Sequence, residues 1–113
     1  MTLNGIVSGT GSIDKTEAGR LTLAGNNTYS GVTTVSAGRL AVAHNNGLGT
    51  TAAGTTVNAG ATLDLYNVTV GREAIILAGG TLTDVTSSLS GDIALTANSY
   101  LGATNTGDTL TLS

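Results

Sequence analysis

Two short stretches of this sequence decide its fold class: Ala18-Gly-Arg-Leu-Thr-Leu23 and Ala37-Gly-Arg-Leu-Ala-Val42. Each begins with Ala-Gly and continues with aliphatic residues at alternate positions. The pattern returns at Ala59-Gly-Ala-Thr-Leu-Asp-Leu65 and at Ala78-Gly-Gly-Thr-Leu-Thr83, so the Ala-Gly pairs lie 19, 22 and 19 residues apart. Self-similarity at a period of about 20 residues is typical of repeat architectures.

The alternation within each repeat predicts short β-strands with one buried face, because side chains alternate between the two faces of a strand. It extends to Ile93-Ala-Leu95 and Leu110-Thr-Leu112. No stretch combines apolar residues at three- and four-residue spacing with helix caps, so the sequence predicts an all-β protein.

A unit of about 20 residues cannot bury its own apolar face, but stacked units can, each strand pairing with its equivalent one turn along at ~4.8 Å. The repeats therefore predict a parallel β-helix, or β-solenoid, with rungs of about 20 residues. Four glycines are expected at a recurring corner, where a positive φ favours glycine: Gly19, Gly38, Gly60 and Gly79. The alternative is a β-sandwich with hairpin turns such as Asn46-Gly47, which would recur at irregular spacing.

The alternation also predicts which side chains face the core. The residues expected to be buried are Leu21, Leu23, Leu40, Val42, Leu63, Leu65, Leu82, Leu110 and Leu112. The residues expected to face outward are Thr22, Ala41, Asp64, Thr83 and Thr111. A slip of one residue would exchange the two sets, so this prediction tests the register.

Composition excludes several classes of protein. A length of 113 residues suits one domain, and the absence of Cys rules out disulfide frameworks and Cys-ligated zinc. Four basic residues and a net charge of −3 argue against a nucleic-acid surface. The apolar runs are shorter than the ~20 residues of a membrane helix, so no membrane insertion of this segment is expected.

The chemistry-bearing residues form no recognisable site. His44 is the only histidine and lies in the polar stretch Ala43-His-Asn-Asn-Gly47, which predicts an exposed loop histidine. Asp64 and Asp84 lie one repeat apart, but the position equivalent to Asp64 is Thr83, so the two carboxylates can face different ways. We therefore expect no catalytic, cofactor-binding or metal-binding residue and no cofactor.

Two further patterns have ordinary explanations. Arg20 and Arg39 occupy equivalent positions and are expected to be exposed neighbours, with an anion or glycan contact as the functional alternative. Asn26-Asn27-Thr28 and Asn67-Val68-Thr69 match the N-glycosylation pattern, which we interpret as accidental.

The run from Lys15 to Leu40, Lys-Thr-Glu-Ala-Gly-Arg-Leu-Thr-Leu-Ala-Gly-Asn-Asn-Thr-Tyr-Ser-Gly-Val-Thr-Thr-Val-Ser-Ala-Gly-Arg-Leu, resembles the autotransporter-associated β-strand repeat. The resemblance is strongest over residues 13–65. It implies a right-handed parallel β-helix of the kind that forms passenger domains of Gram-negative autotransporter adhesins.

From the resemblance we expect residues 1–113 to be one solenoid segment of roughly five to six rungs, part of a longer array at the outer-membrane surface or outside the cell. Its expected role is that of a rigid stalk or adhesion scaffold, without enzymatic activity. The alternatives are a self-associating module that stacks head to tail into a filament, and a carbohydrate-binding or polysaccharide-cleaving β-helix. The partners expected are neighbouring copies or flanking rungs of the same protein, paired end to end, and surface glycans or proteins.

Overall fold

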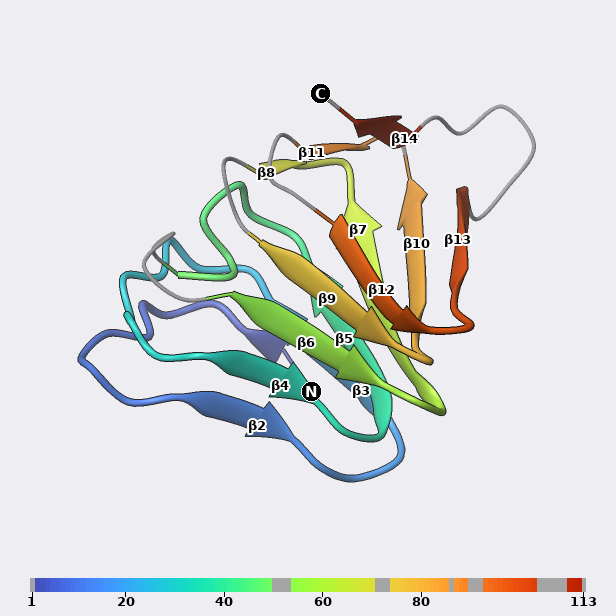
Figure 1. The fold of residues 1–113 in the computed structure, drawn as a ribbon. Coiled ribbons are helices and arrows are strands. Elements are labelled where there is room, and N and C mark those ends of the chain that lie inside the picture. The colour runs from blue at the N-terminus through green and yellow to red at the C-terminus, as the bar shows by residue number, and fades with distance from the viewer. Residues whose placement is uncertain are drawn as a thin grey trace.

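The computed structural model describes residues 2–49, 54–70, 74–85, 87–89, 93–103 and 110–112, and for residues 84, 85, 87–89, 103 and 110–112 it describes the backbone. The strands lie in three parallel sheets (Figure 1). Sheet A is formed in spatial order by β1 (Thr2–Leu3), β3 (Arg20–Leu23), β5 (Gly38–Val42), β7 (Ala61–Tyr66), β10 (Thr81–Val85) and β13 (Tyr100–Ala103). Sheet B is formed by β12 (Ile93–Ala97), β9 (Ile75–Ala78), β6 (Thr55–Asn58), β4 (Thr33–Val35) and β2 (Ile13–Lys15). Sheet C is formed by β14 (Leu110–Leu112), β11 (Ser87–Leu89) and β8 (Thr69–Val70).

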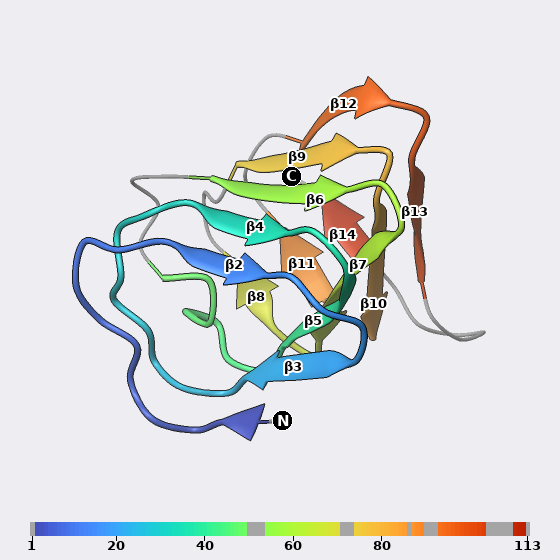
Figure 2. The same cartoon turned by 90° about the horizontal axis from the view of Figure 1, so that it is seen from below.

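The chain coils from one sheet to the next, and each strand pairs with its equivalent from the following turn. In sheet A, Leu40 pairs with Leu21 on one side and with Leu63 on the other, 19 and 23 residues away. Figure 2 shows the strands of sheet B side by side along the stack. The predicted β-solenoid is thereby confirmed, and no helix occurs among the described residues.

The predicted register is confirmed by two inward-facing columns of sheet A. The first column aligns Leu21, Leu40, Leu63, Leu82 and Leu101. The second aligns Leu23, Val42 and Leu65, all with no exposed surface. Leu21 is only half-buried, against the prediction. The side chains of Leu110, Thr111 and Leu112 lie outside the described part of the structure.

Sheet B supplies the opposite wall of the core. Val35, Val57 and Leu77 are aligned and have no exposed surface. The same column continues to Lys15 at one edge and to Leu95 at the other. Leu95 is 61% exposed although its neighbour Leu77 is buried, because β12 is the outermost strand of this sheet.

The predicted glycine corner recurs at the beginning of four successive strands of sheet A, just before β3, β7 and β10 and as the first residue of β5. Gly19, Gly38, Gly60 and Gly79 have φ angles of 110°, 71°, 82° and 89°. A Cβ at Gly38 would lie 2.5 Å from the carbonyl oxygens of Glu17 and Gly19, so this corner requires both the positive φ and the missing side chain.

Candidate functional surfaces

The outward face of sheet A carries one polar network. Arg39 Nη1 lies 3.5 Å from Asp64 Oδ2, and the Thr83 hydroxyl donates a hydrogen bond of 3.1 Å to Asp64 Oδ1. Thr83 pairs with Asp64 in the sheet, which confirms that these two positions are equivalent in their repeats. The guanidinium comes from the strand next to β7, so one carboxylate joins three neighbouring strands.

The predicted outward orientation of Asp64 is confirmed, but its side chain is shielded from solvent. Its side chain is 4% exposed, whereas that of Arg39 is 46% exposed. Ala41, next to Asp64 in the same outward row, has no exposed surface. Both residues do lie on the outward face, since Leu40, Leu63 and Leu65 on the alternate positions fill the core.

Long side chains on the same face account for this burial. The Arg20 guanidinium carbon lies 5.8 Å from the centre of the Tyr66 ring. Arg20 and Tyr66 belong to β3 and β7, on either side of β5, so the contact passes over the strand that holds Ala41. We call Arg20, Arg39, Asp64, Tyr66 and Thr83 the sheet A cluster. Arg20 and Arg39 are thus aligned neighbours, as expected, and each has a partner on this face.

The acidic residues of the sheet A cluster can be compared with those of a glycosidase site. Such a site needs two carboxyl groups on either side of the scissile bond. Among the side chains that the structure describes, the cluster brings one carboxylate, Asp64, into its network. The backbone of Asp84 pairs with Leu65, one register position beyond Asp64.

A second polar group, an asparagine ladder, runs along the loops between sheets A and B. Asn27 is buried, accepts a hydrogen bond of 2.9 Å from the Val7 amide and donates one of 2.8 Å to the Gly47 carbonyl. The Asn46 side-chain amide donates to the Asn26 side-chain oxygen at 2.8 Å. Asn27 therefore connects three successive turns of the coil.

Sequence reasoning missed the ladder and its aromatic neighbour. Tyr29 is 1% exposed, and its hydroxyl lies 2.6 Å from the buried Thr33 Oγ1. The signal for the ladder was present, because Asn26-Asn27 recurs as Asn45-Asn46 nineteen residues later. From the sequence alone, Asn46 is interpreted as part of a turn and Asn26-Asn27-Thr28 as an accidental glycosylation pattern.

His44 belongs to a local turn. Its Nδ1 accepts a hydrogen bond of 3.0 Å from the Asn46 amide, and its carbonyl accepts one of 2.9 Å from the Gly47 amide. The prediction of an exposed histidine is wrong. The side chain is half-buried, because the turn folds Asn46 and Gly47 back onto it. Among the described residues, no group of three or more His, Cys, Asp or Glu residues could hold a metal ion.

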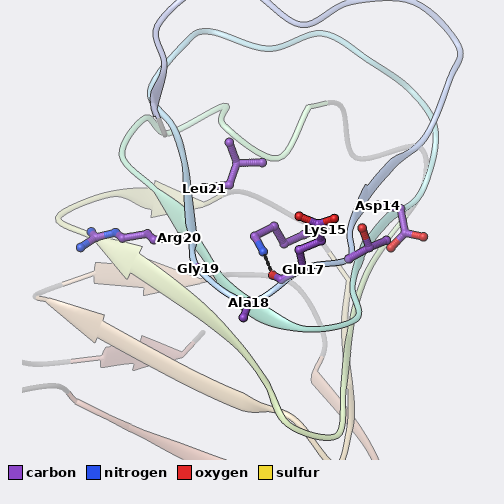
Figure 3. A pocket seen from close by; sticks show the side chains of 8 residues that line it. Asp14, Lys15, Glu17, Ala18, Gly19, Arg20 and Leu21 are labelled. Atoms are coloured by element: carbon purple, nitrogen blue, oxygen red, sulfur yellow. Dashed lines mark hydrogen bonds between the residues drawn. The ribbon is translucent and has the colours of Figure 1, made fainter.

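An open hollow lies at the corner between β2 and β3, lined by residues 14–21 (Figure 3). The Lys15 ammonium donates hydrogen bonds to the carbonyl oxygens of Glu17 and, at 3.4 Å, of Ala37. Asp14 Oδ1 accepts a hydrogen bond of 3.0 Å from the Ser36 hydroxyl. The contacts with Ala37 and Ser36 connect corners of successive turns, so Asp14 and Lys15 contribute to the solenoid itself.

The fold and these surfaces define a β-solenoid repeat protein whose polar groups connect its turns. In agreement with this, residues 13–42 match the Passenger-associated-transport-repeat family. The chain is also 32% identical over 90 residues to the adhesin BmaC autotransporter of Brucella suis biovar 1 (strain 1330), a match that covers 79% of this chain and 3% of that adhesin. No solved structure matches the chain significantly.

Residues 13–42 are thus a passenger-associated transport repeat, and the similarity over 90 residues supports an autotransporter passenger as the setting of the chain. It spans a small part of the length of the adhesin that it matches. No helix among the described residues is long and apolar enough to cross a membrane.

Proposed function

We propose that this chain is a rigid stalk or adhesion scaffold within an autotransporter-type passenger, at the outer-membrane surface or outside a Gram-negative cell. The similarity to an autotransporter adhesin supports the setting. In this role the segment has no enzymatic activity, and its sheets continue end to end into flanking rungs of the same protein.

The observation that supports the scaffold role is that the buried polar side chains contact neighbouring turns of the coil. Asn27 joins three turns, and the Arg39–Asp64–Thr83 network joins three strands of sheet A. Buried side-chain amides and carboxylates elsewhere often bind ligands, but here they bind the neighbouring turns. Such contacts between adjacent repeats are what stabilise a solenoid.

The proposal is tested in the parent adhesin on the cell surface. Alanine substitutions at Arg20 and Tyr66 remove the side chains of the sheet A cluster that lie outside the Arg39–Asp64–Thr83 network, and Leu63→Ala opens the core. A scaffold predicts that cells with the surface variant adhere as the wild type does, whereas Leu63→Ala lowers protease resistance and adhesion together. Surface display is measured with an antibody to another part of the passenger.

The alternative, in which this segment itself contacts a glycan or protein, predicts the opposite outcome. Tyr66 is 48% exposed and lies against the Arg20 guanidinium, and Tyr and Arg are side-chain types that favour recognition surfaces. Loss of adhesion in the surface variant, with display and protease resistance unchanged, would contradict a purely structural role and assign binding to the sheet A cluster.

A further inference from the structure

The asparagine ladder contains a chemically reactive pair, Asn46-Gly47, in the loop that follows β5 (Figure 1). Asparagine followed by glycine is the dipeptide most prone to spontaneous deamidation, because glycine has no side chain to hinder attack by its backbone nitrogen on the asparagine side chain. Asn46 is exposed to water, whereas Gly47 is buried. The pair therefore joins a reactive amide at the surface to a backbone nitrogen inside the turn.

Deamidation of this pair begins at the backbone of Gly47. The Gly47 nitrogen loses its proton and bonds to the side-chain carbon Cγ of Asn46. The Cγ–Nδ2 bond breaks, and the side-chain amide leaves as ammonia. Water then opens the cyclic imide at either of its two carbonyl groups, which gives aspartate or isoaspartate at position 46. Both products replace a neutral amide with a carboxylate, and isoaspartate also adds a methylene group to the backbone.

Three hydrogen bonds hold the pair in a geometry that opposes this reaction. The Gly47 amide donates to the His44 carbonyl at 2.9 Å, so the proton that must leave is engaged. The Asn46 side-chain amide donates to Asn26 Oδ1 at 2.8 Å, which fixes the group that must be attacked. The Asn46 carbonyl accepts from the Gly49 amide at 3.0 Å, which fixes the peptide that must rotate for the ring to close. Ring closure therefore requires local opening of the turn.

Close packing explains why glycine stands next to Asn46 despite the reactivity of the pair. A Cβ added at Gly47 would lie 2.8 Å from Val42 Cγ1 and 3.1 Å from the Leu23 carbonyl oxygen. Val42 and Leu23 have no exposed surface. A larger residue would displace these core residues, so the fold retains the reactive pair and holds it through hydrogen bonds.

The isoaspartate product would disturb the ladder at a buried contact. The Gly47 carbonyl accepts the hydrogen bond of 2.8 Å from the Asn27 side chain, which is buried. An additional methylene group before Gly47 displaces this carbonyl, so the Asn27 amide loses its partner. A buried polar group without a partner is costly. A chain with isoaspartate at position 46 therefore cannot close the ladder as the unmodified chain does.

We propose that Asn46-Gly47 is a modification site controlled by folding: it deamidates spontaneously when the turn is open, and the closed asparagine ladder suppresses the reaction. Deamidation then marks chains that stay unfolded, and its isoaspartate product weakens the contact between these turns irreversibly. This inference concerns the chemical durability of the coil and does not depend on the adhesive role.

The test compares deamidation at Asn46 in the folded 113-residue chain and in a peptide of residues 43–49, in the same buffer and at the same temperature. Peptide mapping by mass spectrometry follows the acid products at Asn46 and separates them from those at Asn4-Gly5, the other Asn-Gly pair. The folded chain should react at least about tenfold more slowly than the peptide, because the reaction follows the open fraction of the turn. Equal rates would overturn the proposal.

Two variants at Asn26 locate the protection in the ladder. Asn26→Ala removes the partner of the Asn46 side chain and should speed deamidation of the folded chain about two- to tenfold. Asn26→Asp keeps an oxygen acceptor at this position and should react at the wild-type rate. Circular dichroism checks that both variants keep the β-sheet signal of the wild type. An unchanged rate in Asn26→Ala would contradict protection by the ladder.

The product itself is tested in a chain that carries Asn4→Gln, which removes the other Asn-Gly pair. Incubation in urea followed by ion exchange isolates the chain with isoaspartate at position 46. After refolding it should unfold at a lower urea concentration than the unmodified chain. Asn46→Asp, which leaves the length of the backbone unchanged, should lose less. An isoaspartate chain with an unchanged urea midpoint would show that deamidation does not weaken the ladder.

Discussion

At the scale of single residues, direction and burial are separate properties. Asp64 faces away from the core, as the alternation of Leu63 and Leu65 predicts, yet it is as buried as many core residues. The side chain of Arg39, from the neighbouring strand β5, forms an ion pair with this carboxylate and shields it from solvent. The sequence predicted the face of Asp64, but the cover depends on the conformation of a long side chain, which no repeat pattern encodes.

Asn27 should be the polar residue on which stability depends most. Asn27→Ala removes both side-chain hydrogen bonds and leaves the Val7 amide and the Gly47 carbonyl without these partners, so we expect a loss of about 2–4 kcal/mol in the free energy of unfolding. The measurement is urea unfolding followed by circular dichroism.

Asn26→Ala is the matched control, because Asn26 is exposed and its side chain contacts only one neighbouring turn in the ladder. Its cost should stay below about 1 kcal/mol. Equal losses for the two variants would show that the buried ladder contributes nothing beyond an ordinary surface hydrogen bond.

At the scale of the strands, the sequence predicted sheet A well and the rest less completely. The Leu-x-Leu pattern and the Ala-Gly corners predicted β3, β5, β7 and β10 with their register. The stretch from Leu23 to Thr33 carries no alternation, and its backbone amides bind carbonyls of the previous turn, such as Thr28 to Val7 at 2.9 Å. Such backbone contacts leave no side-chain pattern, so the buried Tyr29 within this stretch was missed.

The aligned leucines of sheet A should differ in their contribution according to burial. Leu63 has no exposed surface and lies between Leu40 and Leu82, so Leu63→Ala should cost about 2–5 kcal/mol by opening a cavity. Leu21→Ala should cost less, because Leu21 is half-buried and loses less contact. Both are measured by urea unfolding, and a Leu21→Ala loss equal to that of Leu63→Ala would contradict the ranking.

Two of the corner glycines distinguish the energetic cost of a positive φ from the cost of a steric clash. Gly60 has a φ of 82° and no atom within 4 Å of an added Cβ, so Gly60→Ala should cost only the left-handed conformation, about 1–2 kcal/mol. Gly38→Ala adds the contacts of 2.5 Å with the Glu17 and Gly19 carbonyls and should cost about 1–3 kcal/mol more. Thermal unfolding ranks the two variants, and equal melting temperatures would show that the corner of Gly38 widens freely.

At the scale of the whole molecule, charged residues are few, and several of those that the structure describes contact a neighbouring turn. Calcium sites gather six to eight oxygen ligands, and the described side chains offer no group of three acidic or histidine residues. We therefore expect the same melting temperature in calcium chloride as in sodium chloride of equal ionic strength. A specific rise with calcium would favour the carbohydrate-active alternative, with Asp64 and Asp84 as the first residues to substitute.

The stability of a solenoid is distributed as a sum over neighbouring turns, so it should fall from the middle of the stack to its edges. β5 and β7 are each paired on both sides and contain the fully buried Leu40 and Leu63. β2 and β12 are the outermost strands of sheet B and carry the half-buried Lys15 and the exposed Leu95.

Native-state hydrogen exchange of the 113-residue chain should therefore show the greatest protection for the amides of β5 and β7. The amides of β2 and β12 should exchange fastest among the paired strands. Equal protection in all strands of the wild-type monomer would instead mean that the coil opens as one cooperative unit.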